Sequence, residues 1–282
     1  MIVSQLCVYP LKSCQGINLP EAEVRTKGFL WDREMMLVSG NGKFITQRQF
    51  PQLALVRVEI VDRMISIGLK DRSFPSLSFS IVPTGKTVEV EIWRDRILAV
   101  DRGDEIAAWF QRFLNLDGEK TCRLVQQSPE HIRPITIKYP SQENTPLGFA
   151  DNYPIMLTNT ASLEELNQRI VEIHLSQNQA VSMDCFRPNI VIDSTEPFME
   201  DRWSLIQIGE IQFQVVKPCS RCIITTIDGE VGTKKQSKEP LSTLGTFRQL
   251  SEQGVMFGVN MIPQNQGTIK VGDRLEVMET RF

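Results

Sequence analysis

Two cysteines three residues apart, Cys219 and Cys222, are the side chains of this sequence best suited to chemistry. They follow an apolar run at residues 211–216, which predicts a strand, and they are separated by Ser220 and Arg221. A thiolate, rather than a thiol, binds metals and attacks electrophiles, and neighbouring positive charge favours the ionised sulfur. One of the two cysteines is therefore a candidate soft ligand for a metal.

Cysteines at this spacing also occur in zinc sites, in thioredoxin-like redox sites and as inert core residues. A zinc site needs four ligands, whereas the other four cysteines stand singly and His131 and His174 are isolated. A thioredoxin-like pair opens a helix, whereas the β-branched residues 223–227 predict a strand. An inert buried pair stays open at this point, because free cysteine often acts as a small apolar residue.

Several segments around the cysteines resemble the MOSC domain of molybdenum-cofactor proteins. The matching segments are PCSRCIITTID at 218–228, KEPL at 238–241, GTIKVGD at 267–273 and FRPNIV at 186–191. Further segments resemble the N-terminal β-barrel of the same family, namely VYPLKSCQG at 8–16, WDR at 31–33 and TQRQ at 46–49. The resemblance covers nearly the whole chain in order. It is nearest to the mitochondrial amidoxime-reducing components and their bacterial counterparts.

Length and composition are compatible with this resemblance. The chain has 282 residues, 41% of them hydrophobic, which is enough for one large or two ordinary domains. Its net charge of −3 argues against a nucleic-acid polymer as partner. The sequence has no signal-peptide pattern and no apolar run near membrane-spanning length, so we expect a cytoplasmic protein without a membrane partner. The chain opens directly at the expected barrel with Met1, which favours a soluble, bacterial-type form.

Short apolar or alternating runs dominate the first part of the chain. They lie at residues 53–61, 64–69, 77–82 and 87–92, separated by turn residues, and they predict a β-barrel or sandwich. Helical spacing of apolar residues then predicts a helix over 104–114, with Asp104 as its N-cap, that closes the first domain.

A polar, proline-containing segment at 126–146 predicts a loop at the junction of two domains. After it we expect a strand at 155–157, a helix at 160–167 with a capping-box-like start, and further strands up to residue 277. The predicted fold is α+β and predominantly β. It comprises an N-terminal β-barrel-like domain at 1–120 and a C-terminal MOSC β-barrel with a few helices at 121–282.

The resemblance implies that Cys222 is the molybdenum ligand and the catalytic residue, with Cys219 as a neighbour. A single protein thiolate suits a metal whose other sulfur ligands come from the dithiolene of molybdopterin. The resemblance further implies cofactor-binding residues from both domains: Lys12, Ser13, Arg33, Asp151, Asn152, Arg187, Asn189, Ser220 and Arg221. Asp151 either bonds the pterin or caps a turn. A cofactor contact of Tyr153 stays open, as do surface ion pairs for Arg33 and Arg187.

The activity implied by the resemblance is reduction of N-hydroxylated compounds, such as amidoximes and N-hydroxylated bases, by a molybdenum-cofactor-dependent oxidoreductase in N-reductive detoxification. The sequence lacks a dinucleotide fingerprint and a second cysteine cluster, so we expect a separate electron donor. That donor is a ferredoxin, a flavodoxin or a b5-type cytochrome with its reductase. One alternative is a carrier that delivers the cofactor or a persulfide sulfur through Cys222. The sequence lacks the pyridoxal-phosphate domain of cofactor sulfurases. The other alternative is a non-catalytic cofactor-binding protein.

Overall fold

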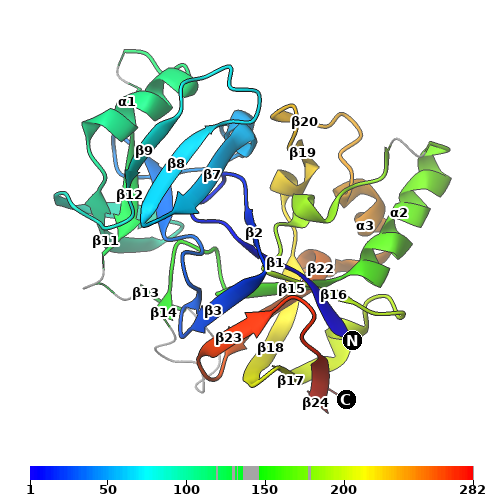
Figure 1. Cartoon of the computed structure of the whole chain (residues 1–282). Helices are drawn as coiled ribbons and strands as arrows, with labels where there is room; N and C mark the ends of the chain where they lie inside the picture. Colours follow the sequence, from blue (N-terminus) through cyan, green and yellow to red (C-terminus); the bar gives the residue numbers. More distant parts are fainter. Residues whose placement is uncertain (119, 129–130, 132, 136–145, 177–178, 282) are drawn as a thin grey trace.

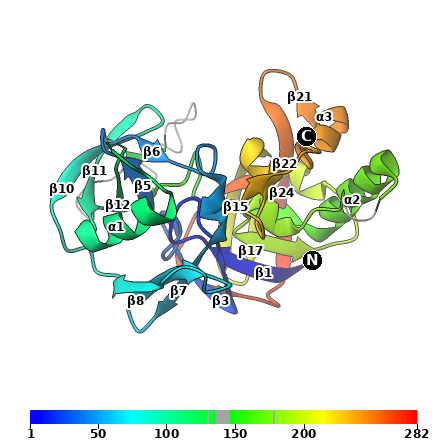
Figure 2. The same ribbon diagram turned by 90° about the horizontal axis from the view of Figure 1, so that it is seen from above.

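The computed structural model describes every residue except 119, 129–130, 132, 136–145, 177–178 and 282 (Figure 1). The chain forms two lobes, and Figure 2 shows them side by side, with helix α1 in one lobe and helices α2 and α3 in the other. Strands are the dominant element among the described residues. The predicted α+β fold of predominantly β character is confirmed.

The first lobe is built on two antiparallel sheets that enclose an apolar core. One has the strand order β10-β11-β12-β5-β6 and the other has the order β7-β8-β9. The strands are β5 Met35–Ser39, β6 Phe44–Ile45, β7 Val56–Val61, β8 Met64–Leu69, β9 Leu77–Ser80, β10 Thr87–Ile92, β11 Asp95–Asp101 and β12 Cys122–Gln127. Strands β8 and β10 have the predicted bounds. The strand predicted at 53–61 begins instead as the 3-10 turn η1, Pro51–Leu55.

Helix α1, Asp104–Phe113, closes the core of the first lobe. Ile106 and Phe110 on its inner face are buried, as the helical spacing predicted. The predicted N-cap is wrong by one residue, because Gly103 is the N-cap and has φ +97°. Asp104 lies in the first helical turn, where its negative charge faces the positive end of the helix dipole.

The second lobe is built on one large, mainly antiparallel sheet. Its strand order is β2-β1-β16-β15-β22-β18-β17-β24, and β21 pairs with β22. The strands are β1 Ile2–Val8, β2 Ile17–Leu19, β15 Ile155–Asn159, β16 Ile190–Asp193, β17 Trp203–Ile208, β18 Ile211–Ser220, β21 Gln249–Leu250, β22 Gly254–Pro263 and β24 Leu275–Thr280. Ile206, Phe213 and Met261 are among the fully buried side chains of its core.

The two ends of the chain share sheets. Strand β1 pairs with β16, and β3, Glu21–Arg25, pairs with β23, Gly267–Lys270. Figure 1 shows β3 in blue directly beside β23 in red. Strand β3 also pairs with β4, Gly28–Phe29, from which the chain continues into the first lobe. The division at residue 120 stays a prediction, but strands β1 and β3 pair with strands from the last third of the chain.

Helices α2, Thr160–His174, and α3, Leu241–Phe247, pack together at one side of the second lobe (Figure 1). Asn159 is the N-cap of α2, and its side chain accepts a hydrogen bond from the Ala161 amide. The helix extends beyond residue 167 to His174, and Ile170, which we expect on the same apolar face as Leu166, is fully buried. Across the described parts of the chain, no helix has the length and apolar character needed to cross a membrane.

The strand predicted at 223–227 is wrong for most of its length. Residues Ile223–Thr226 form the 3-10 turn η6, and short pairing begins only at β19, Ile227–Asp228, opposite β20, Thr233–Lys234. The Thr225 hydroxyl donates to the Cys222 carbonyl at 2.9 Å. This local hydrogen bond competes with sheet pairing and overrides the β propensity of the segment.

The loop predicted at 126–146 lies largely outside the described residues. Its described ends contribute the last residues of β12 and a short pairing of β13, Arg133–Pro134, with β14, Pro146–Leu147. Arg133 is buried and donates from Nη1 to the carbonyl of Ala150 at 2.8 Å. This contact helps to fix the backbone that leads into Asp151.

Candidate thiol-centred site

Cys222 lies between the end of strand β18 and the start of turn η6. Its side chain lines a pocket whose walls come from both lobes. Arg48 of the first lobe donates from Nη2 to Cys222 Sγ at 3.3 Å. The thiol therefore lies at the junction of the lobes, beside a guanidinium group.

Cys219 lies in a different environment, although it also lines the pocket. Its side chain packs against the apolar cluster that contains Phe186 and Phe257. Its sulfur accepts a hydrogen bond from Arg221 Nη1 at 2.9 Å. Packing and this hydrogen bond hold Cys219 in place, which agrees with a structural role for this sulfur.

The ten residues that the sequence predicted for the site all line this one pocket. They are Lys12, Ser13, Arg33, Asp151, Asn152, Arg187, Asn189, Ser220, Arg221 and Cys222. Tyr153 lines it as well. Residues from the first 33 positions thus meet residues from positions 151–222. The roles that the resemblance implies for them as cofactor ligands stay predictions.

Lys12 and Asp151 form an ion pair on the pocket wall. Lys12 is buried and also donates to the Phe149 carbonyl at 2.7 Å. Burial raises the pKa of Asp151, but the charge and hydrogen bond of Lys12 outweigh it and lower that pKa to about 2. Asp151 is therefore ionised, and it bonds a lysine rather than capping a turn.

Arg33 and Asn189 form a hydrogen-bonded network beneath the pocket. Arg33 Nη1 ion-pairs with Asp32 at 2.6 Å and donates to Asn189 Oδ1 at 2.9 Å. Asn189 Nδ2 donates to the Cys7 carbonyl at 3.1 Å, and Arg33 Nη2 donates to the Arg187 carbonyl at 3.0 Å. The surface ion pair considered for Arg33 is wrong, because the guanidinium is mostly enclosed and links the two lobes.

Arg187 contrasts with Arg33. It follows the 3-10 turn η4, Met183–Phe186, in the left-handed conformation at φ 55°. Its guanidinium lies 4.2 Å from the centre of the Tyr9 ring and has no ion pair among the described residues. Burial lowers the pKa of Arg187, its largest perturbation. Arg187 therefore presents positive charge to the pocket without a carboxylate to neutralise it.

Arg221 has one donor atom that no described protein group accepts from. Its Nη2 donates to the Phe186 carbonyl at 2.6 Å, and its Nη1 contacts the sulfur atoms of Met156 and Cys219. Its Nε is buried and has no hydrogen-bond partner among the described residues. A buried donor without a partner is rare in folded proteins and points to a missing acceptor.

Sequence reasoning missed Arg48, which lines the pocket, and Trp93, which contacts two of the lining residues from outside it. Arg48 belongs to the TQRQ segment used for the resemblance, but it had not been assigned to the pocket. Trp93 Nε1 donates to Asp151 Oδ1 at 3.2 Å, and nothing in the sequence around it indicates that contact. His174 does not line the thiol pocket and instead contacts Glu239 at 2.9 Å.

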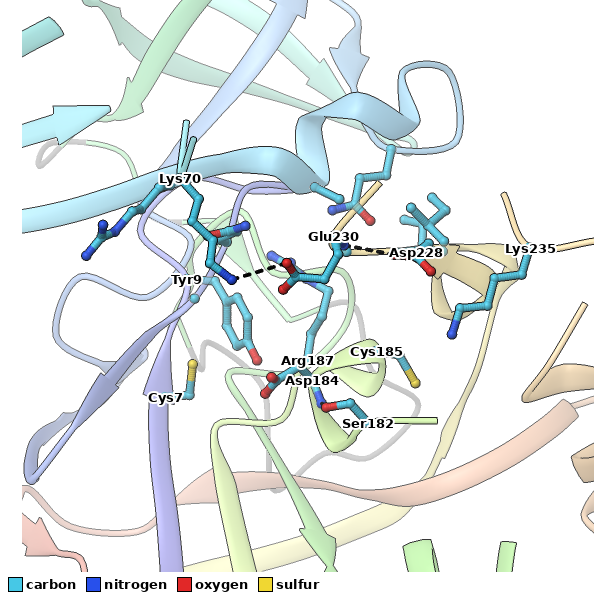
Figure 3. Close-up of a pocket in the computed structure, with 18 of the residues that line it drawn as sticks. Cys7, Tyr9, Lys70, Ser182, Asp184, Cys185, Arg187, Asp228, Glu230 and Lys235 are labelled. Carbon is cyan, nitrogen blue, oxygen red and sulfur yellow. Dashed lines mark hydrogen bonds and ion pairs between the residues drawn. The ribbon is translucent and has the colours of Figure 1, made fainter. Parts of the chain in front are cut away.

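A second cavity, of about 650 Å³, is lined by residues from both lobes (Figure 3). The two cavities share Arg187 and Ile224 in their walls. Lys70 of the first lobe and Glu230 of the second form an exposed ion pair at 3.2 Å on its lining. Arg187 is thus accessible from two sides, and the second cavity lies along the junction of the lobes.

Comparisons with known proteins agree with this architecture. The MOSC N-terminal beta barrel domain matches residues 1–117, and the MOSC domain matches residues 144–276. Mitochondrial amidoxime-reducing component 1 of Mus musculus is 32% identical over 285 residues, which cover 96% of this chain and 80% of that protein. The Homo sapiens protein of the same name is 32% identical over 288 residues, covering 96% and 81%.

A further relative has a different name and a much longer chain. Molybdenum cofactor sulfurase of Danio rerio is 31% identical over 274 residues, which cover 93% of this chain but 32% of that protein. The two domain matches together include the residues that line the thiol pocket. The chain belongs to the MOSC-domain family that includes the mitochondrial amidoxime-reducing components.

Proposed function

We propose that this protein binds the molybdenum cofactor in the thiol pocket and reduces N-hydroxylated compounds with electrons from a separate protein. The observation that carries the proposal is the position of Cys222, whose thiol faces a pocket that also contains the uncompensated cation Arg187. A soft ligand beside unneutralised positive charge suits a metal cofactor that carries sulfur ligands and a phosphate. The names of the two amidoxime-reducing relatives support the same reaction class.

The residues present fit this cofactor. Cys222 would bind the metal, and Arg187 would hold the phosphate, for which guanidinium is the best-matched side chain. The buried Nε of Arg221 needs an acceptor, which the heteroatoms of a pterin supply. When bound, the cofactor would supply a redox-active Lewis acid, which no protein side chain can replace.

The proposed reaction balances as follows for an amidoxime. Two electrons and two protons cleave the N–O bond, and the products are the amidine and one water molecule. One proton is added to the nitrogen and the other to the departing hydroxyl oxygen. A ferredoxin, a flavodoxin or a b5-type cytochrome with its reductase would supply the electrons, because the chain's own cysteines form no cluster suited to iron and sulfur.

The likeness to molybdenum cofactor sulfurase favours one second candidate, namely delivery of the cofactor or of a persulfide sulfur through Cys222. The two functions differ in turnover. A reductase consumes many equivalents of substrate per protein, whereas a carrier transfers one sulfur or one cofactor and stops. Mass spectrometry would detect a persulfide as one added sulfur on Cys222.

The test uses protein made in a host that synthesises the cofactor. We expect about one molybdenum per chain and reduction of benzamidoxime or 6-hydroxylaminopurine with a chemically reduced dye. Cys222→Ser should lose metal and activity, with Cys219→Ser as the matched control that retains both. Protein without metal or pterin, or holoprotein that reduces no N-hydroxylated compound, would contradict the proposal.

A further inference from the structure

The turn between β10 and β11 holds a bulky residue in a conformation that favours glycine. Ile92 pairs with Asp95, so Trp93 and Arg94 form a two-residue turn. Trp93 has φ +58°, in the left-handed region that such turns usually fill with Gly, Asn or Asp. A bulky side chain persists there only when surrounding contacts hold it, and such residues cluster at binding sites.

Three contacts hold the Trp93 indole beside the thiol pocket. Its Nε1 donates to Asp151 at 3.2 Å, its ring centre lies 5.1 Å from that of Phe44, and the Arg48 guanidinium lies 4.9 Å from the ring centre. Asp151 and Arg48 both line the pocket. Trp93 nevertheless stays 44% exposed, which leaves part of the ring open to a ligand.

Arg48 connects this indole to the thiol. Its Nη2 lies 3.3 Å from Cys222 Sγ, while its nearest carboxylate among the described residues, Asp151, is 4.0 Å away. An Nη–carboxylate distance of 4.0 Å is too long for a hydrogen bond. Arg48 therefore keeps donor capacity for a ligand bound next to Cys222, and the indole holds its guanidinium in place through a cation–π contact.

We propose that Trp93 and Arg48 form the recognition site for the substrate's planar body and its oxygen. The indole packs against a flat, conjugated group, and Arg48 donates a hydrogen bond to the N-hydroxyl oxygen beside Cys222. This inference rests on the proposed function and narrows its substrate class. Among N-hydroxylated compounds, the site favours those whose N–O group is conjugated with an aromatic or heteroaromatic ring.

The two residues act on different steps. Packing against Trp93 is the same before and during reaction, so its loss should raise KM. Negative charge grows on the oxygen as the N–O bond breaks, so the Arg48 hydrogen bond strengthens in the transition state and its loss should lower kcat. Arg48 contacts Cys222 and Trp93 contacts Asp151, both predicted to hold the cofactor, so kcat is expressed per bound molybdenum in every variant.

The experiment compares benzamidoxime with acetamidoxime, which lacks a ring, using holoenzyme and a chemically reduced dye. Trp93→Leu should raise KM for benzamidoxime about tenfold and leave KM for acetamidoxime within about twofold, while Trp93→Phe retains the preference in KM. Arg48→Gln should lower kcat about a hundredfold with both substrates. Arg57→Gln, in the wall of the second cavity, is the matched control and should behave like the wild type.

A binding measurement separates this inference from the proposed function. Benzamidoxime added to the oxidised holoenzyme, without an electron donor, should give a saturable change in tryptophan fluorescence that Trp93→Leu abolishes. If the wild type binds in this way but turns over no N-hydroxylated compound, the proposed function fails and the recognition site stands. An unchanged benzamidoxime preference or an unchanged fluorescence response in Trp93→Leu overturns the inference, as does an unchanged kcat in Arg48→Gln.

Discussion

Two arginines that contact the same aromatic ring should respond differently to the same substitution. The guanidiniums of Arg33 and Arg187 lie 4.4 Å and 4.2 Å from the centre of the Tyr9 ring. Arg33 ion-pairs with the buried carboxylate of Asp32, whereas Arg187 has no ion pair among the described residues. Replacement of each by Met keeps an extended apolar side chain and removes the charge. We expect Arg33→Met to impair folding and Arg187→Met to impair cofactor binding.

The contacts of each arginine determine how much stability or cofactor affinity its replacement should cost. Arg33→Met leaves Asp32 buried, with one backbone donor from Tyr9 at 2.9 Å, and should cost about 3–5 kcal/mol of unfolding free energy. Arg187→Met loses a cation–π contact of about 0.5–2 kcal/mol but also removes the cost of burying an unpaired charge. Its net effect on stability should therefore stay within about 1 kcal/mol. Loss of a charge-assisted phosphate contact should weaken cofactor binding about tenfold to a hundredfold.

Urea unfolding of the cofactor-free variants measures the first effect, and molybdenum content of protein from a cofactor-competent host measures the second. Each variant serves as the control for the other, because both lose one positive charge next to Tyr9. If Arg187→Met unfolds as readily as Arg33→Met and still holds a full complement of molybdenum, Arg187 is a structural residue. The phosphate site would then have to lie elsewhere.

Three further outcomes follow from contacts at the site and in the sheet. Cys222→Ala should abolish metal binding while Cys219→Ala retains more than half of it, as read by metal analysis; equal losses would reopen a paired-thiol site. The pKa of Asp151 falls from 3.8 to about 2 on folding, so Asp151→Asn should lower the free energy of unfolding at pH 7. Urea titrations should show this difference in unfolding free energy between variant and wild type disappear as the pH falls from about 4 to about 2. Gly258→Ala should cost more than about 2 kcal/mol in the same assay, because φ is +70° and the added Cβ would lie 2.6 Å from the Leu157 carbonyl oxygen; wild-type stability would disprove that clash.

The local sequence pattern was sufficient to predict secondary structure where neighbouring residues alone determine it. Strands β8 and β10 match their predicted bounds because alternation and turn residues at both ends define them. The turn after Cys222 could not be predicted this way, since β-branched residues favour a strand and only the hydroxyl contacts of Thr225 and Thr226 favour a 3-10 turn. The helix starting at Asp104 was placed correctly, but a glycine with positive φ took the capping position.

The residues of the site also differ in whether the sequence alone could identify them. Family resemblance identified Lys12, Arg187 and Cys222, and the structure places them around one pocket. Sequence could not identify Trp93, because its role depends on a contact across 58 positions with Asp151. The sequence could not show either that Arg33 is held by an ion pair and by hydrogen bonds, because its partners come from both lobes. Motifs therefore located the pocket, whereas its internal hydrogen bonds required coordinates.

The pairing of β3 with β23 has a consequence for synthesis of the chain. Residues 21–25 leave the ribosome long before their partner residues 267–270 are made. Long-range pairing of this kind slows folding. Until the partner strand is made, the unpaired edge of β3 is prone to non-native pairing and aggregation. Lys12, located between β1 and β3, therefore reaches its place in the pocket late. A ribosome-bound chain that ends before residue 267 should remain sensitive to protease at its N-terminus and unable to hold the cofactor.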